Sequence, residues 1–480
     1  MNYLNIIKPK EFKKIKLVEI FFYALPLSFI LGNLILSINV LLFIIFSFFL
    51  IKKENLTYRF NNTNWFLIIF FLYLFLSTLI QFNEYDIWIQ KAKDAFADQP
   101  AEANLLPIWQ KKNLTLENHP IFKSLILIRF VFLIFLIDTL FYNKILSIKK
   151  FFLSSFICTS FVSLDILFQY IFGFDVFGMK NNGRYNSGPF GDELISGGYL
   201  QTFSFFSFFY IFFINKNKNL SKPGIYFIIA IHALAIAFSG NRMPLLLFLL
   251  GCTILIILIK KIRVVMTIGL TIFVAVFFIA LSNDKNIKLP YQNFYLQTIG
   301  SIFENDTSNK VGKENLNEDG VAETYWKVGP EGSEKNFLRT TGHARIYITA
   351  IEMWKENYLF GFGLKSFRVK CWEILPRIDG LSCANHPHNY YLELLSEAGI
   401  LGSSLIFIFF IILISKSFKF LIKGINKKNE NLYFLIPMIL VFFLEIWPLR
   451  STGSFFTNWG STLFWLNVAL LQANLMKNRN

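Results

Sequence analysis

Long runs of apolar residues alternate with short polar segments along most of the chain. About twelve of these runs approach the roughly 20 apolar residues with which an α-helix crosses a bilayer. They cover residues 17–33, 35–51, 65–81, 121–141, 151–172, 197–214, 224–240, 243–259, 264–282, 400–415, 432–448 and 455–474. The first two runs are continuous, and Gly32-Asn33 offers the turn between them. The pattern predicts an all-α integral membrane protein with about 12 transmembrane helices.

The composition supports this fold class. Hydrophobic residues make up 54% of the 480 residues and charged residues only 16%, whereas soluble domains have about 45–50% and about 25%. These values exclude a soluble enzyme, a disordered chain and a secreted disulfide scaffold. A β-barrel is disfavoured because its strands alternate and carry no long apolar runs.

The charges indicate how the predicted helices cross the membrane. The chain has 47 Lys and Arg against 31 Asp and Glu, a net charge of +16. Basic clusters precede the first predicted span and follow the second, fourth, sixth, eighth, tenth and twelfth. All of them fall on one side, which the positive-inside rule assigns to the cytoplasm. We therefore expect both termini to be cytoplasmic, the first span to be retained rather than cleaved, and no nucleic-acid partner.

The opposite side of the membrane carries the long loops, 82–120 and 283–399. The latter begins with a polar stretch, 305–333, that is typical of a flexible surface segment. Apolar residues at helical spacing predict helices over 345–357 and 389–398. We expect three parts: helices one to nine within 1–282, the large loop with its helices at 283–399, and helices ten to twelve within 400–480.

The loop contains a histidine motif, His386-Pro387-His388-Asn389. Asn389 is a good N-cap for the helix that follows, so His388 is expected at the mouth of that helix. A helix N-terminus disfavours added positive charge, and a neutral imidazole there suits a general base. Two alternatives stay open: histidines that only bond the backbone of the loop, and a metal site shared with His343. No HExxH or similar ligand spacing supports the metal.

Three arginines are predicted on the side away from the cytoplasm: Arg184, Arg242 and Arg345. Guanidinium groups bind phosphate oxygens through paired donors, so these arginines suit a lipid-linked diphosphate. The alternatives are snorkelling towards head groups and ion pairs with loop acids such as Asp192 or Glu193.

The cysteines suggest little further chemistry, and the sequence contains no cofactor motif. Cys158 and Cys252 lie within predicted spans, whereas Cys371 and Cys383 lie in the large loop and are either a disulfide or two free thiols. No nucleotide-binding or other cofactor motif occurs, so we expect no cofactor.

The histidine motif resembles a known family. His388-Asn389, nine residues and Gly399-x-x-Gly402 are similar to the His-Asn-x9-Gly-x-x-Gly signature of the O-antigen ligase family, whose superfamily also contains Wzy-type polymerases.

Three further segments resemble that family. The turn Ser239-Gly240-Asn241-Arg242 is one, and Arg345 with the segment 354–363 is another, in which Tyr358 replaces the usual proline. Arg184, with the glycine-rich residues after it, is the third. The resemblance covers about 180–415.

The resemblance implies a metal-independent glycosyltransferase in the bacterial inner membrane, with its active site facing the periplasm. It implies transfer of a glycan from undecaprenyl diphosphate to a lipid A–core or similar acceptor in lipopolysaccharide biosynthesis. On this hypothesis His388 is catalytic, Arg184, Arg242 and Arg345 bind the diphosphate, and His386, Asn389, Gly399 and Gly402 support the site.

Other functions stay open. The same signature occurs in polymerases that join repeat units and in relatives that transfer a glycan to protein. A transporter also suits twelve spans, although transporter substrate groups lie near the bilayer midplane. Here the unusual polar residues lie near the membrane surface, and the long histidine-containing loop favours a ligase.

Overall fold

The computed structural model describes residues 9–53, 57–58, 60–95, 119–181, 185–214, 222–295, 342–374, 381–426, 432–451 and 453–477. These residues form helices joined by turns, with an isolated antiparallel bridge between Phe174 and Lys180.

The N-terminal half runs through α1 (Pro9–Tyr23), α2 (Leu25–Ile30), α3 (Asn33–Lys53), α4 (Asn64–Ala95), α7 (Pro120–Leu127), α8 (Arg129–Tyr142) and α9 (Ile148–Phe172). After the short turn η2 (Gly188–Phe190) come α10 (Ser196–Phe209), the π-helical turn η3 (Tyr210–Ile214), α11 (Lys222–Phe238), α12 (Arg242–Leu258), α13 (Lys260–Asn283) and α14 (Lys285–Tyr295). The rest comprises α17 (Gly342–Glu356), α18 (Phe367–Ile374), α19 (Tyr390–Asn426), α20 (Leu432–Glu445) and α21 (Asn458–Lys477).

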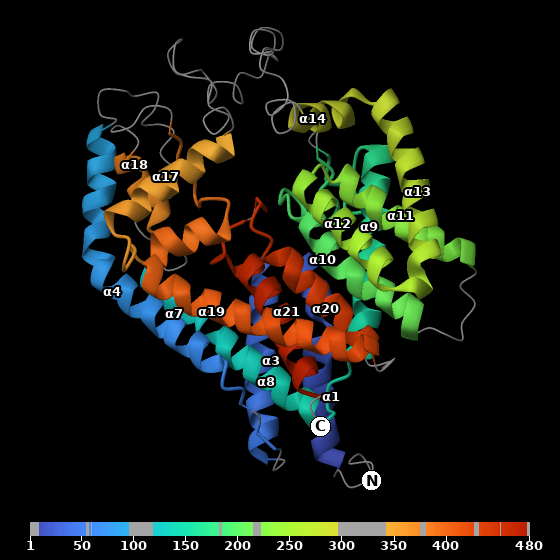
Figure 1. Ribbon diagram of the computed structural model, residues 1–480, viewed down its shortest axis with the longest axis horizontal. Coiled ribbons are helices and arrows are strands. Elements are labelled where there is room, and N and C mark those ends of the chain that lie inside the picture. The colour runs from blue at the N-terminus through green and yellow to red at the C-terminus, as the bar shows by residue number, and fades with distance from the viewer. Residues whose placement is uncertain are drawn as a thin grey trace.

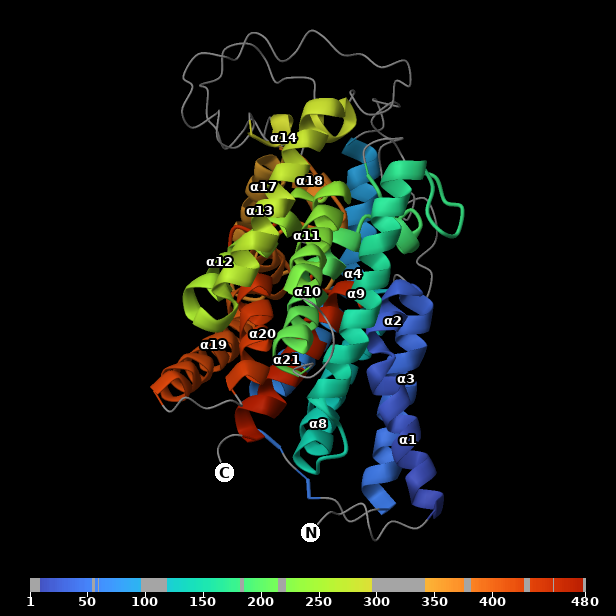
Figure 2. The same cartoon turned by 90° about the vertical axis from the view of Figure 1, so that its right-hand side faces the viewer.

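The helices form a bundle whose two ends differ. α11 packs between α9 and α13, α21 packs against α8 and α20, and α19 packs against α4. α1 begins and α21 ends near one end of the bundle, whereas α14, α17 and α18 lie at the opposite end (Figure 1, Figure 2).

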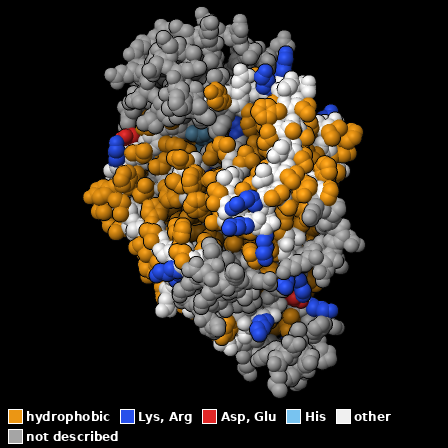
Figure 3. Space-filling view, turned by 45° about the vertical axis from the view of Figure 1, so that its right-hand side comes forward, with side chains coloured by type: hydrophobic (Ala, Val, Ile, Leu, Met, Phe, Trp, Pro, Cys, Tyr) orange, Lys and Arg blue, Asp and Glu red, His pale blue; other side chains and the backbone are white. Residues whose placement is uncertain are grey.

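The outside of the bundle is apolar. Leucine, isoleucine and phenylalanine side chains are exposed along most of the helices, and they cover much of the face in Figure 3. Six helices of the described residues are long and apolar enough to cross a membrane, and shorter apolar helices accompany them. Such an apolar surface is stable in lipid rather than in water. The chain is therefore a multi-pass membrane protein.

Each of the twelve predicted apolar ranges falls mostly on helix, and the structure differs from the prediction most clearly in two places. The first range contains a break, with α1 ending at Tyr23 and α2 beginning beside Pro26, whose missing N–H is tolerated in a first helical turn. The chain then turns at Gly32, as the sequence indicated.

The second error concerns the loop expected at 82–120. Its first part is helical, because α4 continues to Ala95. Tyr85 and Trp88 are buried there: the Tyr85 hydroxyl donates to the carbonyl of Leu364, and the Trp88 ring packs edge-on against Phe362 at 5.5 Å. These contacts belong to a small second core between the end of α4, α17 and α18. Residues 305–333 lie outside the described residues.

Candidate active site

His388 lies immediately before the capped end of α19. The side-chain oxygen of Asn389 accepts the backbone N–H groups of Tyr391 at 3.0 Å and Leu392 at 3.2 Å. Its amide nitrogen donates to the carbonyl of Pro448 at 2.9 Å, so the cap also ties the helix to the segment after α20. His388 itself has φ of 55°, a left-handed conformation that is costly for a residue with a Cβ. The surrounding contacts hold it there.

Three histidines meet at this point. The centroid of the His388 ring lies 4.2 Å from that of the His386 ring and 4.9 Å from that of the His343 ring. His343 comes from the first turn of α17 and the other two from the segment before α19. Within the described part of the chain, no three His, Cys, Asp or Glu side chains form a set that could hold a metal ion.

The positive charge of Arg242 acts on one of these histidines. Partial desolvation and the charge of Arg242 hold the pKa of His343 below its usual value of 6.5. Both effects favour the neutral imidazole of His343. The structure thus brings together His343, His386, His388 and the charge of Arg242, although the sequence had assigned no role to His343 beyond the metal alternative.

The turn that presents Arg242 is fixed on both sides. Arg242 is the first residue of α12, and its Nη1 donates to the carbonyl of Pro290 on α14 at 3.1 Å. The turn before it contains Gly240 at φ of 76°, and the Asn241 side chain accepts the N–H of Gly197 on α10 at 3.2 Å. The arginine is therefore held between α10 and α14 at the edge of the helix bundle.

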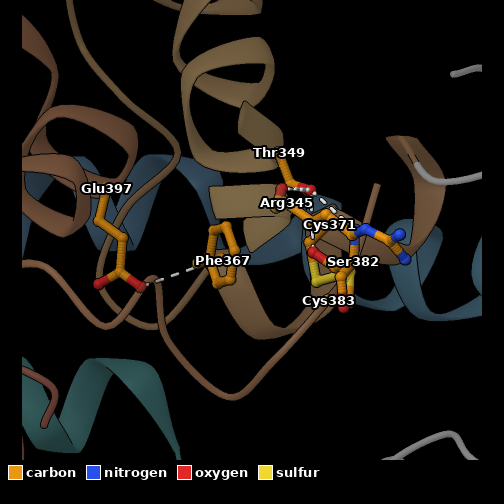
Figure 4. Close-up of a disulfide and its surroundings, with 7 residues drawn as sticks. All are labelled: Arg345, Thr349, Phe367, Cys371, Ser382, Cys383 and Glu397. Atoms are coloured by element: carbon orange, nitrogen blue, oxygen red, sulfur yellow. Dashed lines mark hydrogen bonds between the residues drawn. A yellow bond between two sulfur atoms is a disulfide. The ribbon is translucent and has the colours of Figure 1, made fainter. Parts of the chain in front are cut away.

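Arg345 shares the first turn of α17 with His343, and α17 packs near the segment that contains the Cys371–Cys383 disulfide (Figure 4). The Thr349 hydroxyl contacts the carbonyls of Arg345 at 3.0 Å and Ser382 at 2.9 Å, which joins α17 to the disulfide segment. Arg184 lies outside the described residues.

The glycines of the histidine motif lie at a break in α19. Gly399 has φ of 62° and ψ of −174°, a region that is essentially restricted to glycine. Gly361, at φ of 70°, faces it, and a Cβ on Gly361 would come within 2.5 Å of the Glu397 carbonyl oxygen. The two segments approach so closely because both glycines lack side chains.

Backbone hydrogen bonds then replace those that the break removes from the helix. The N–H groups of Phe362 and Gly363 donate to the carbonyls of Ser396 and Glu397, at 3.2 and 2.8 Å. The N–H groups of Ile400 and Leu401 donate to the carbonyls of Tyr358 and Leu359, at 2.9 and 3.1 Å. The segment 358–363 therefore completes both ends of the broken helix.

Residues 225–407 match the model of the O-antigen ligase family, Wzy_C. The chain carries an O-antigen ligase domain. This match confirms the resemblance that the motifs indicated, and no curated protein matches the chain. The ligase domain runs from α11 into α19 and includes Arg242, His343, Arg345 and His388, whereas Arg184 precedes it.

Helices outside the ligase domain hold its glycine break in place. The Tyr73 hydroxyl on α4 contacts the carbonyls of Phe360 at 2.8 Å and Ala398 at 3.0 Å. Its ring occupies the space that a side chain at Gly402 would need, since a Cβ there would lie 2.5 Å from a ring carbon. Sequence analysis missed Tyr73, because nothing in a lipid-facing run marks one tyrosine as a partner of a distant glycine.

A buried ionic network lies below the histidines. Glu397 accepts the N–H of Lys365 at 2.7 Å, and Glu393 accepts the N–H of Phe455 at 2.6 Å and the hydroxyl of Ser454. The Lys365 ammonium donates to the Ser454 hydroxyl at 2.7 Å. Burial and the nearby Arg368 lower the pKa of Lys365 to about 8, against the opposing effect of the two glutamates.

This network joins the first turns of the ligase helix α19 to the loop before α21. The only sequence signal was the i, i+4 spacing of Glu393 and Glu397 directly after the histidine motif. Glu445 on α20 forms a separate ion pair with Arg450 at 2.7 Å.

Proposed function

We propose that the protein transfers a glycan from undecaprenyl diphosphate to a lipid A–core or similar acceptor in surface polysaccharide synthesis. The observation that carries this proposal is the meeting of three histidine rings, beside the charge of Arg242, within an O-antigen ligase domain. A proton acceptor next to a fixed cation suits the transfer of a sugar from a diphosphate.

The proposed reaction assigns separate tasks to these residues. His388 accepts the proton of the acceptor hydroxyl while that oxygen forms a bond to the anomeric carbon. The bond from that carbon to the diphosphate oxygen breaks, and undecaprenyl diphosphate leaves with the bonding electrons. Arg242, Arg345 and Arg184 stabilise the charge that grows on the diphosphate, without a metal or another cofactor.

The orientation is part of the proposal. About twelve spans, with both termini in the cytoplasm, place the segment 283–399 and the histidine cluster in the periplasm of a bacterial inner membrane. Parts 1–282 and 400–480 supply the transmembrane helices. The charge pattern supports this orientation, as does the position of α17 at the end of the bundle opposite the start of α1 and the end of α21 (Figure 2).

His388→Ala tests the catalytic role. We expect loss of polymer on surface lipopolysaccharide, because no imidazole remains to accept the acceptor's proton, while the amount of folded protein in the membrane is unchanged. His119→Ala, which alters a histidine stacked on Phe82 at a 4.6 Å centroid distance, is the control. Wild-type polymer from the His388→Ala strain would overturn the catalytic role.

The diphosphate role is tested by Arg242→Ala combined with Arg345→Ala. We expect at least a tenfold loss of affinity for a purified polyprenyl-diphosphate donor, measured by thermal shift in detergent, since a charge-assisted pair contributes about 1.5–3 kcal/mol. Arg263→Ala on α13, whose Nε donates to the carbonyl of Ile256 at the end of α12 at 2.9 Å, is the control. Unchanged affinity in the double variant contradicts the assignment.

The alternative function is a Wzy-type polymerase, because the same domain family and chemistry serve both activities. The lipopolysaccharide of a deletion strain separates them. Polymer that accumulates on its lipid carrier indicates that a ligase was lost, and core bearing one repeat unit indicates that a polymerase was lost. Transport is less favoured, since the histidine cluster lies at the bundle end rather than in its middle. Transfer to a protein acceptor is a further, less favoured alternative.

A further inference from the structure

The chain turns back along the outside of α9 directly after that helix ends. Gly173, at φ of 82°, ends the helix, and residues 173–181 form a hairpin. The N–H of Val176, near the hairpin tip, donates to the Asp165 carboxylate at 2.8 Å. Asp165 lies seven positions before Phe172, a rise of about 10 Å at 1.5 Å per residue. The tip therefore lies alongside the transmembrane part of α9, not above it (Figure 2).

The N–H groups at the hairpin tip, from Asp175 to Met179, are paired within the hairpin or with α9. The Asp175 carboxylate accepts the N–H groups of Phe177 at 2.9 Å and Met179 at 2.7 Å, and its own N–H donates to the Met179 carbonyl at 2.9 Å. The Gln169 amide donates to the same carbonyl at 3.1 Å. Irregular backbone can enter a lipid phase only when such groups are paired.

The side chains at the tip are apolar and uncovered. Phe177 is 69% exposed and Val176 52% exposed, and the Phe177 ring lies 6.5 Å from that of Phe161 in the middle of α9. Phe161 belongs to an exposed apolar stripe of α9 together with Ile157 and Leu164. The hairpin tip thus extends the lipid-facing surface of a membrane-crossing helix.

We infer that hairpin 173–181 is a re-entrant membrane anchor whose tip, Val176–Phe177, inserts among the lipid chains of the leaflet nearest the histidine cluster. Bilayer lipid is the occupant because the tip is continuous with the lipid-facing stripe of α9. The N–H groups of the tip are already paired and need no acceptor from a partner protein. Lys180, exposed at the hairpin base, suits the head-group layer above.

The anchor is coupled to the candidate active site. Near the end of α9, the Tyr170 ring packs against the Phe238 ring, with 4.3 Å between the ring centroids. The Asn186 amide, in the segment after the hairpin, donates to the Phe238 carbonyl at 2.7 Å. Phe238 directly precedes the turn that presents Arg242, so the anchor sets the depth of that arginine relative to the lipid surface.

Spin-label accessibility in nanodiscs of phosphatidylethanolamine and phosphatidylglycerol tests the anchor. The background is the full chain with Cys158→Ala and Cys252→Ala, which keeps the disulfide, and single labels are introduced by Phe177→Cys and Val176→Cys. Ile157→Cys, at a position 58% exposed on α9, is the lipid control, and Asp192→Cys, in the following loop, is the water control.

The tip labels are expected to be reached by oxygen and shielded from a nickel chelate, as the Ile157 label is. Access of the chelate to both tip labels equal to that at Asp192 overturns the anchor. Low access of both reagents also overturns it, because protein then covers the tip. The result is independent of the glycan-transfer activity, so the anchor and the proposed function can fail separately.

Discussion

His388 adopts a left-handed backbone conformation one residue before the cap of α19. Such strain persists only where neighbouring contacts impose it, and it is common at functional sites. Here the contacts come from Asn389, which binds both the helix and the segment at Pro448. The motif asparagine therefore has an architectural role, while the role proposed for the motif histidine is chemical.

The effect of Arg242 on His343 gives a prediction at this scale. Arg242→Gln removes a positive charge that lowers the pKa of His343, so that pKa should rise. Diethyl pyrocarbonate modifies only neutral imidazoles. At about pH 6 the wild type should thus be modified at His343 faster than the variant, with the midpoint of its pH dependence below 6.5.

Peptide-resolved mass spectrometry measures the modification of His343 separately from that of the other histidines. Arg263→Gln, which removes a positive charge elsewhere in the protein, is the control. An unchanged or lower midpoint in Arg242→Gln would contradict the proposed effect of the Arg242 charge on His343.

At the scale of elements, α19 consists of two helices that meet at Gly399, and the segment 358–363 supplies hydrogen bonds to both. The glycines of segment 358–363 and those of the histidine motif, Gly399 and Gly402, therefore belong to one packed substructure. The part of α19 before Gly399 follows His388 and carries Glu393 and Glu397. The part after Gly399 continues through the membrane. A glycine joint allows the part before Gly399 to take its own direction.

Gly399→Ala should destabilise the protein. The backbone conformation at this position costs a residue with a Cβ about 1–3 kcal/mol, and a Cβ would also lie 2.6 Å from the amide nitrogen of Gly361. Gly198→Ala in α10 is the matched control, because open space surrounds that position and its φ is not positive.

Thermal unfolding in detergent, followed by size-exclusion chromatography, measures both variants. We expect a lower Tm for Gly399→Ala and little change for Gly198→Ala. Equal stability of the two variants would contradict the tight approach at the break.

At the scale of the whole molecule, a membrane bundle carries a small second core at one end. The ligase domain supplies α17, α18 and the histidines to that end, while Tyr73, Tyr85 and Trp88 of α4 and Ser454 before α21 hold it from outside the domain. Isolated residues 225–407 thus lack contacts that fix the site.

The proposed orientation predicts the outcome of reporter fusions. Green fluorescent protein fused after Lys477 should fluoresce, because it folds in the cytoplasm, and alkaline phosphatase fused after Asn283 should be active, because it needs the periplasm. Phosphatase fused after Leu258, at the predicted cytoplasmic end of α12, is the inactive control. An active phosphatase at Leu258 would reverse the assigned orientation.

Sequence alone located the helices and the family domain, because both depend on local patterns. Apolar run length set the helices, and the spacing of His388, Gly399 and Gly402 identified the family. The length of α4 was missed, since its last turns are stabilised by Leu364 and Phe362, far away in the sequence. For the same reason no local pattern in the sequence pairs the Asp165 carboxylate with the N–H of Val176.

The sequence by itself therefore determined a multi-pass helical membrane protein with an O-antigen ligase domain, because hydropathy and motif spacing are written in consecutive residues. The tertiary structure decided which side chains meet: His343 with His388, Gly361 with Gly399, and Tyr73 with both glycine segments. Such pairs join residues tens to hundreds of positions apart. Their proximity follows from how the helices pack, and no local pattern encodes it.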